Sequence, residues 1–296
     1  HHGMFREHCV SCHGINGNGA GPTASVQFPY PRNFRMGIFK WKSTRRASMP
    51  TIDDIAGTLR RGIAGTAMPT FALQAPEDRQ ALAQYVVFLS IRGQTERQCM
   101  QLLADEPADS VEEIKSLVQE TAAEITQRWL DAENEVVDVP AVPDYVTDDA
   151  DTLSADLVKR HRESVTAGRK LFNGKVTGCA GCHGVDAAGG VETLDYDDWT
   201  KDYTTRLGIT PGDRDTMRPI RAAGALRPQP IRPRDLRHGI LHGDPSPQAM
   251  YRRLVTGIPG TPMPAAALVQ ADAGQPGITP QQLWDLVNYV YTLGDG

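Results

Sequence analysis

The pentad Cys9-Val10-Ser11-Cys12-His13 returns later in the chain as Cys179-Ala180-Gly181-Cys182-His183. Each pentad is followed by a Gly-Thr-x-Met-Pro segment, at residues 65–69 after the first and at residues 260–264 after the second. In each pentad two thiols can stand on a single helical turn, and an imidazole follows them directly. The repetition of sulfur and nitrogen ligands in one order predicts two bound groups of the same kind.

Cys-x-x-Cys-His is the attachment signature of c-type haem. The two thiols can add to the two vinyl groups of a porphyrin, and the next imidazole then reaches the iron. A methionine that arrives from the opposite side completes six-coordinate iron and raises its reduction potential. The sequence therefore predicts two covalently bound haem c groups.

Zinc sites and thioredoxin-like centres also use Cys-x-x-Cys. A zinc site of this kind needs a second ligand pair, commonly about 15–20 residues away. Here the second pentad begins at Cys179, far from the first at Cys9. A thioredoxin-like centre needs a βαβ setting, which the sequence does not indicate. The haem interpretation is favoured over both.

Two further segments recur between and after these motifs. Residues 31–37 match residues 233–239, and residues 82–86 match residues 286–290. All the matches keep their order, which indicates a duplicated domain. The second copy is enlarged over about residues 191–230, where Tyr196, Trp199 and Tyr203 stand among acidic residues.

Composition gives the broad class. The 296 residues are 40% hydrophobic and 23% charged, as is ordinary for globular domains, and the length suits two of them. The apolar runs are too short for a transmembrane helix. A net charge of −5 hides an acidic middle, because residues 104–157 hold 16 acidic and two basic side chains. The basic residues form no stripe, so we expect no nucleic-acid partner.

Apolar periodicity of about 3.6 residues predicts a mainly α fold. We expect helices over residues 76–90 and from Thr279 onward, the latter opened by a capping box with Gln282. An amphipathic helix is expected over about residues 110–133. We predict a first domain at 1–98, an acidic connector at 99–160 and a second domain at 161–296.

Both halves resemble class I c-type cytochrome domains, over roughly residues 1–95 and 165–296, and the whole resembles a di-haem cytochrome c. The resemblance implies thioether attachment through one cysteine pair per domain. It implies His13 and Met68 as ligands of the first iron and His183 and Met263 as ligands of the second. It also places Phe5 near Tyr85 and Phe172 near Tyr289. The attachment pairs are Cys9 with Cys12, and Cys179 with Cys182.

Several residues are candidates for supporting roles. In this family a proline carbonyl often accepts the N–H of the proximal histidine, and Pro22 suits that role in the first copy; the second copy has no equivalent proline. Arg32, Arg234 and Trp41 are candidate donors to the haem propionates, with solvated side chains as the alternative. Cys99 is expected to be a partly buried free thiol. Methionines that compete as ligands are Met36, Met49, Met217 and Met250, of which Met217 is the main rival to Met263.

Two irons closed by protein ligands leave no open position for a substrate. The predicted function is therefore a soluble electron carrier, or an electron-transfer subunit, that passes single electrons between redox proteins. Mildly basic surfaces around exposed haem edges are expected to dock these partners.

Two alternatives stay open. One is a di-haem enzyme, either peroxidase-like or thiosulfate-oxidising. The other is a module of a larger membrane redox complex. Covalent haem attachment takes place outside the cytoplasm in bacteria, so the resemblance implies a periplasmic or otherwise extracytoplasmic setting. We expect that any secretory signal has already been removed from this sequence.

Overall fold

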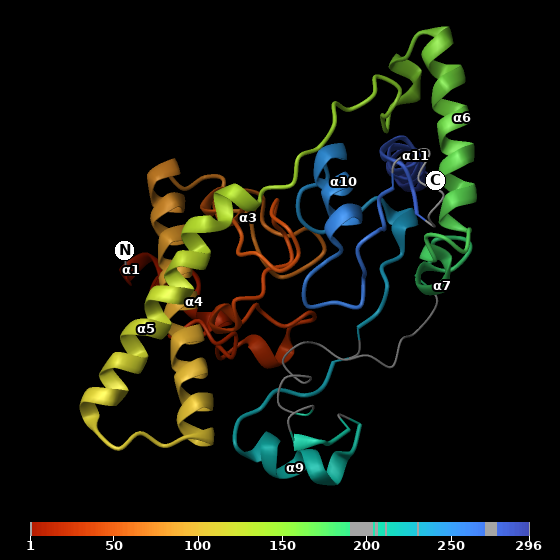
Figure 1. The fold of residues 1–296 in the computed structure, drawn as a ribbon. Coiled ribbons are helices and arrows are strands. Elements are labelled where there is room, and N and C mark those ends of the chain that lie inside the picture. The colour runs from red at the N-terminus through yellow and green to blue at the C-terminus, as the bar shows by residue number, and fades with distance from the viewer. Residues whose placement is uncertain are drawn as a thin grey trace. The chain divides into compact units, whose positions relative to one another are not determined.

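The computed structural model describes residues 2–189, 204, 207–210, 212–229, 231–269 and 277–295. Helices dominate these residues, and extended pairing among them is limited to two isolated bridges, Thr44 with Val136 and Leu268 with Ile278. The predicted mainly α fold is confirmed. The chain forms two compact units (Figure 1): a first unit of His1–Val136 with Arg214–Arg227, and a second unit of Val137–Asp213 with Pro228–Gly296.

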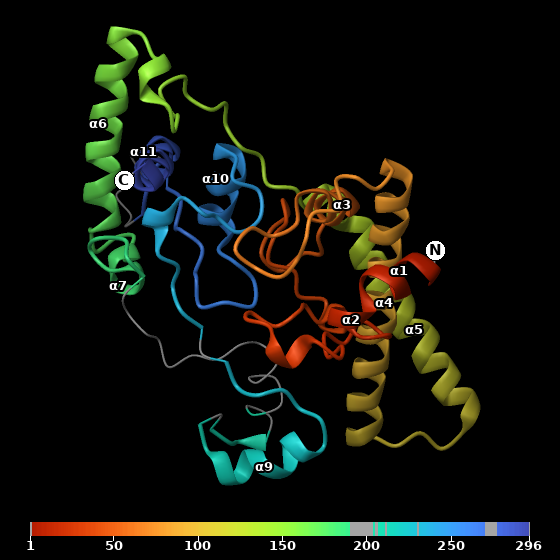
Figure 2. The same cartoon turned by 180° about the vertical axis from the view of Figure 1, so that it is seen from behind.

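The first unit is built around the long helix α4, with α1 and α2 on one side of it and α5 along it (Figure 2). Its elements are α1 (His2–His8), α2 (Val10–His13), η1 (Ala24–Val26), η2 (Phe34–Met36), α3 (Ile52–Arg61), α4 (Pro76–Asp105), α5 (Val111–Leu130), η3 (Asp131–Glu135) and α9 (Arg214–Ala222).

The second unit is built around the crossing of α6 and α11. Its elements are η4 (Ala150–Thr152), α6 (Ala155–Phe172), α7 (Cys179–His183), η5 (Leu236–His238), α10 (Pro247–Thr256), α11 (Pro280–Thr292) and η6 (Leu293–Asp295).

Side-chain caps fix where the second unit's later helices begin. The Ser246 hydroxyl accepts from the Ala249 N–H, and Pro247 occupies the first position of α10. Thr279 and Gln282 cap α11 reciprocally, as the sequence predicted. These caps set the register in which α10 and α11 present their apolar faces to the core.

The acidic stretch contributes to both cores. Helix α5 lies along α4 and buries Ile125 and Trp129 in the first unit's core. Its amino-terminal half is exposed: Val111 keeps 60% of its surface open to solvent. Further on, Tyr145 and Val146 belong to the second unit's core. Residues 99–160, expected as a separate connector, are therefore shared between the units.

Helix α4 is longer than the apolar pattern indicated. The expected helix ended at residue 90, whereas α4 continues to Asp105. Helix α5 lies beside α4 (Figures 1 and 2), and beyond residue 90 α4 is also tied to η2 through Arg35 and Glu96. Cys99 is buried on this extension, at 5% exposure.

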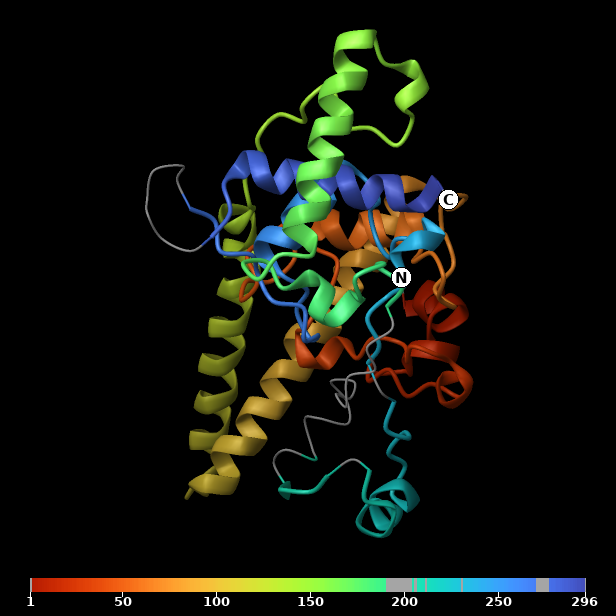
Figure 3. The same cartoon turned by 90° about the vertical axis from the view of Figure 1, so that its right-hand side faces the viewer.

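An edge-on aromatic pair marks the helix crossing of each unit. The ring centroids of Phe5 and Tyr85 lie 5.0 Å apart, and those of Phe172 and Tyr289 lie 5.4 Å apart. The two contacts expected from the family resemblance are confirmed. In the second unit α6 (green) crosses α11 (blue), as Figure 3 shows. Gly168 on α6 allows the close approach, because a Cβ there would meet the backbone of α11.

We predict that Gly168→Ala destabilises the second unit. A Cβ at this position would stand 2.0 Å from the Asp285 carbonyl oxygen and 2.7 Å from the Tyr289 Cβ, so the helices would have to separate. The expected loss is about 1–3 kcal/mol in the free energy of unfolding, measured by denaturant titration. Thr166→Ala, at an exposed position of the same helix, is the control and should stay within about 0.5 kcal/mol. Equal stability of both variants would contradict the close crossing.

Candidate functional site

Each pentad forms one helical turn that a glycine ends. In the first unit the His13 N–H donates to the Cys9 carbonyl at 2.8 Å, and Gly14 follows with φ 75° and ψ 158°. In the second unit the turn is α7, and Gly184 follows with φ 76° and ψ 157°. Positive φ of this kind favours glycine. The two thiols of each pentad, three positions apart, thus lie on one side of a single turn.

Each pentad histidine has one ring nitrogen bound to a backbone carbonyl. His13 Nδ1 lies 2.9 Å from the carbonyl oxygen of Arg32, and His183 Nδ1 lies 3.1 Å from that of Arg234. Because a carbonyl oxygen only accepts, each Nδ1 carries the hydrogen and each Nε2 keeps a lone pair. Both imidazoles are therefore in the tautomer that can bind a metal through Nε2.

The acceptor for His13 is not Pro22, which corrects the expectation from the sequence. The segment around Pro22 binds the backbone of the pentad turn instead. The Gly21 N–H donates to the Cys12 carbonyl at 3.0 Å, and the Thr23 N–H donates to the Ser11 carbonyl at 3.0 Å. The second copy lacks this proline, but its His183 still has an acceptor, the Arg234 carbonyl. The recurrence of Pro-Arg in the repeat was the signal that could have identified the right carbonyl.

The accepting segments are held in the same way in both units. The Phe34 N–H donates to the Gly17 carbonyl at 2.8 Å, and the Leu236 N–H donates to the Ala187 carbonyl at 2.9 Å. Gly17 has φ 72° and Ala187 has φ 58°, a conformation that costs a residue with a Cβ about 1–2 kcal/mol. The second unit keeps the geometry although it has alanine there.

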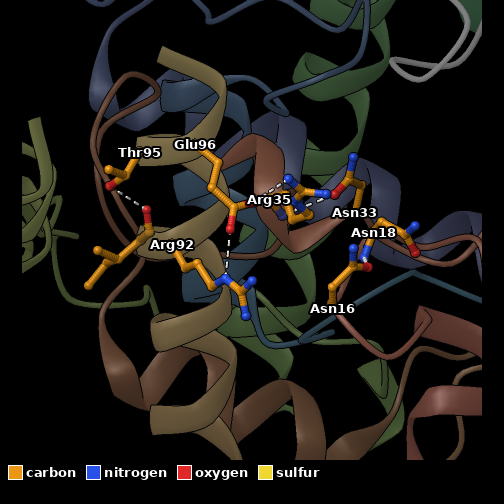
Figure 4. Close-up of polar contacts among 8 residues, drawn as sticks. Asn16, Asn18, Asn33, Arg35, Arg92, Thr95 and Glu96 are labelled. Carbon is orange, nitrogen blue, oxygen red and sulfur yellow. Dashed lines mark hydrogen bonds and ion pairs between the residues drawn. The ribbon is translucent and has the colours of Figure 1, made fainter. Parts of the chain in front are cut away.

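In the first unit ion pairs also connect η2, which follows the accepting segment, to α4. The Arg35 guanidinium binds the Glu96 carboxylate at 2.5 Å, and Arg92 binds the same carboxylate at 2.7 Å (Figure 4). Gly93 lets the backbone of Arg35 approach, because a Cβ there would stand 2.5 Å from the Arg35 Cα. Asn33 accepts from the Arg35 N–H and begins η2. The Arg32 carbonyl is thus fixed by its neighbours.

The two methionine segments adopt the same loop. Thr66 Oγ1 donates to the Ile63 carbonyl at 2.8 Å and accepts from the Met68 N–H at 3.1 Å. Thr261 makes the matching bonds, at 2.8 Å to Ile258 and 3.2 Å from Met263. Both methionines are half-buried. The threonine of the repeated motif therefore positions the methionine that follows it.

Glycine ends the helix before each methionine loop. Gly62 follows α3 with φ 67° and ψ −162°, and Gly257 follows α10 with φ 66° and ψ −172°. This region of backbone space is essentially restricted to glycine. The chain then returns to the helix it left: Phe71 donates to the Leu59 carbonyl at 2.9 Å, and Ala266 donates to the Leu254 carbonyl at 2.7 Å.

Burial controls the protonation of the pentad side chains. It raises the pKa of the Cys9 thiol to about 11, and the nearby Cys12 adds to this; burial also raises the pKa of Cys179. For Cys12, hydrogen bonds with Thr23 and Gln27 outweigh burial and lower the pKa. Three of the four attachment residues are at least partly buried, so a neutral thioether suits them.

Burial lowers the pKa of both pentad histidines. For His13 the charge of Arg32 lowers it further, and the hydrogen bond to the Arg32 carbonyl opposes the shift. For His183 the bond to the Arg234 carbonyl opposes burial in the same way. Neutral imidazole, the form that binds a metal, is favoured at both positions.

These residues fit a c-type haem at each pentad. In the first unit the two thiols stand on one turn, and the adjacent His13 keeps Nε2 available. The half-buried thioether of Met68 lies in a loop that packs against the core of the same unit. The second unit has the same set of donors. Among the described residues no three His, Cys, Asp or Glu side chains gather into another metal site.

The candidate propionate donors have different surroundings. The Arg32 guanidinium is near enough to His13 to lower its pKa. The Arg234 guanidinium donates to the Ile240 carbonyl at 3.0 Å and contacts the His242 ring. Trp41 is half-buried between η2 and α3. Binding of propionates by these three residues stays a prediction.

The competing methionines lie in other places. Met49 and Met250 are buried in the cores of the first and second units. Met36 ends η2. Met217, the main rival to Met263, is buried in α9, which belongs to the first unit. Of the enlarged loop at 191–230, Tyr196, Trp199 and Tyr203 lie outside the described residues.

The cytochrome c family model matches residues 3–90 and 165–294. The chain belongs to the cytochrome c family, with two such domains in tandem. Members bind c-type haem covalently and transfer electrons, and they typically work outside the cytoplasm. Within the described residues no helix is long and apolar enough to cross a membrane.

One solved structure similar to this chain belongs to the Kuenenia stuttgartiensis reducing HAO-like protein complex Kustc0457/Kustc0458. It has a TM-score of 0.62 and 23% sequence identity, and the match covers 99% of this chain and 94% of that chain. At this identity the likeness shows the fold alone. No match was found among curated proteins.

We predict that Gly62→Ala loosens the Met68 loop. An added Cβ would stand 2.8 Å from the Met68 carbonyl oxygen and 2.7 Å from the Pro69 carbonyl carbon, and φ would be unfavourable. The expected cost is about 1–3 kcal/mol in the free energy of unfolding, with a weaker sulfur-to-iron charge-transfer band. Gly57→Ala is the control on α3, where the added Cβ meets only the end of Arg61. It should stabilise the helix by up to about 1 kcal/mol. An unchanged band in Gly62→Ala would argue against Met68 as ligand.

Proposed function

We propose that this chain is a di-haem electron-transfer protein. The first haem is attached at Cys9 and Cys12 and bound by His13 and Met68. The second is attached at Cys179 and Cys182 and bound by His183 and Met263. Each bound haem supplies reversible one-electron chemistry at iron. The chain's residues hold the haems, fix the imidazole tautomers and keep solvent from the ligands.

One observation carries this proposal: the histidine-to-carbonyl bond and the bonds that close the methionine loop recur in both units. The histidine-to-carbonyl bond measures 2.9 Å in one and 3.1 Å in the other. The threonine that closes each methionine loop donates at 2.8 Å in both. Such preserved geometry supports the same ligation at two irons. An iron with protein ligands on both sides exchanges electrons without binding a substrate.

The partners we propose are redox proteins, and the neighbour in the Kuenenia complex supports a role inside a larger assembly. A place as the electron-transfer subunit of such an assembly, in the periplasm, is consistent with the family. The enzyme alternatives, peroxidase-like or thiosulfate-oxidising, need an iron with a displaceable ligand. Spectroscopy distinguishes these cases.

We predict that both haems of the purified protein are low-spin and show a sulfur-to-iron charge-transfer band when oxidised. Met68→Ala and Met263→Ala should each convert one haem to high spin and remove that haem's part of the band. Met217→Ala is the matched control and should leave both haems low-spin. The measurements are optical and electron paramagnetic resonance spectra of both oxidation states. A high-spin haem in the unmodified protein, or rapid turnover of added peroxide, would overturn the carrier function.

Charge gives a second prediction. Outside the acidic stretch the two domains carry an excess of basic residues. If the haem edges lie within basic surface, oxidation of the reduced protein by anionic ferricyanide should slow as salt rises, since the attraction is screened beyond about 10 Å at 0.1 M. Cationic cobalt tris(phenanthroline) should show the opposite dependence in stopped-flow measurements. The reverse pair of slopes would contradict basic docking surfaces.

A further inference from the structure

The two pentad histidines differ in the side chain that faces them. The rings of His13 and Phe34 are stacked, with centroids 4.5 Å apart and planes 19° apart. The position that matches Phe34 in the second unit is Leu236, which cannot stack. The His183 ring instead has a tilted contact with Phe172 at 6.3 Å.

The aromatic contact in the first unit continues to α5. Phe34 stacks with Phe39 at 6.3 Å, and Phe39 meets Trp129 edge-on at 5.7 Å. Phe34 and Trp129 are each only 9% exposed. In the second unit the position that matches Phe39 is Leu241. Phe34, Phe39 and Trp129 thus form an aromatic wall beside His13. The second unit has leucine at the positions that match Phe34 and Phe39.

Burial differs in the same sense. Cys9 is buried and Cys12 is half-buried, whereas Cys179 is half-buried and Cys182 is exposed. Phe34 is buried, whereas Leu236 is half-buried. The first pentad and the residue beside its histidine are thus further from solvent than their counterparts in the second unit.

We propose that the first haem has the higher reduction potential, so that electrons pass from the second haem to the first. This rests on the proposed function. Iron bound by neutral His and Met carries one more positive charge when oxidised than when reduced. An apolar wall and burial away from solvent both disfavour that extra charge. Both therefore favour the reduced state of the first haem.

The transfer balances with one electron. The reduced second iron loses it and becomes ferric, and the ferric first iron gains it and becomes ferrous. A reduced one-electron protein then restores the second haem, and an oxidised one drains the first. The donor accordingly docks on the second unit and the acceptor on the first.

The test is a spectroscopic redox titration of the holo-protein with both haems attached. We expect two one-electron steps. Phe34→Leu, which copies the second unit, should lower the higher step and leave the lower one in place. The expected change is up to tenfold in the equilibrium constant for reduction, which is about 59 mV for one electron. Phe88→Leu, on the exposed side of α4 at 51% exposure, is the matched control and should move neither step.

A second variant makes a smaller change in the same wall. Phe39→Leu, which copies Leu241 of the second unit, should lower the higher step less than Phe34→Leu does and leave the lower step in place. If either variant moves the lower step, or if neither moves any step, the inference is wrong. A high-spin haem before any substitution would instead show failure of the proposed function, so the two failures are distinguishable.

Discussion

The hydrogen bond from each pentad histidine to a backbone carbonyl is the constraint on which the rest of both sites depends. It assigns the hydrogen to Nδ1 and leaves Nε2 for a metal. A backbone acceptor also makes the bond independent of the side chain that carries it. The remaining contacts of the pentad region serve to bring that carbonyl to the ring, through the bonds of Phe34 to Gly17 and of Leu236 to Ala187.

The two units reach one geometry with different residues. Ala187 takes the backbone conformation that Gly17 takes in the first unit, and its side chain is completely buried. Burial of the methyl group, about 0.8 kcal/mol, offsets part of the cost of positive φ. In the first unit a Cβ on Gly17 would lie 3.0 Å from the Phe34 ring and 3.1 Å from Leu89. A methyl group at Gly17 would therefore fit only if Phe34 and Leu89 shifted slightly, which favours glycine in the first unit.

The sequence was informative where chemistry is local. A pentad fits on one helical turn, and a capping box needs only four residues, so α7 and the start of α11 could be predicted from spacing alone. It was less informative where partners are distant in sequence. The acceptor for His13 is Arg32 rather than Pro22, because the chain between them bends back through turns that no periodic pattern records. The extension of α4 to Asp105 was missed for a similar reason: several of its apolar residues, such as Met100 and Leu102, are exposed, and the elements that it contacts, α5 and η2, are distant in sequence. The stacking of Phe34 on His13 depends on the hydrogen bond between His13 and Arg32, which is likewise distant in sequence.

Contacts from the acidic stretch explain why it cannot be treated as a tether. Ile125 and Trp129 complete the first core, and burial of a large side chain contributes about 1.5–3 kcal/mol. Tyr145 completes the second core, where its carbonyl accepts from the buried His161 ring at 2.9 Å. A fragment that ended near residue 98 would expose the apolar surface that α5 covers. It would also remove Trp129 from the aromatic wall that begins at His13. The segment between the duplicated domains is therefore part of what makes the surroundings of the two pentads different.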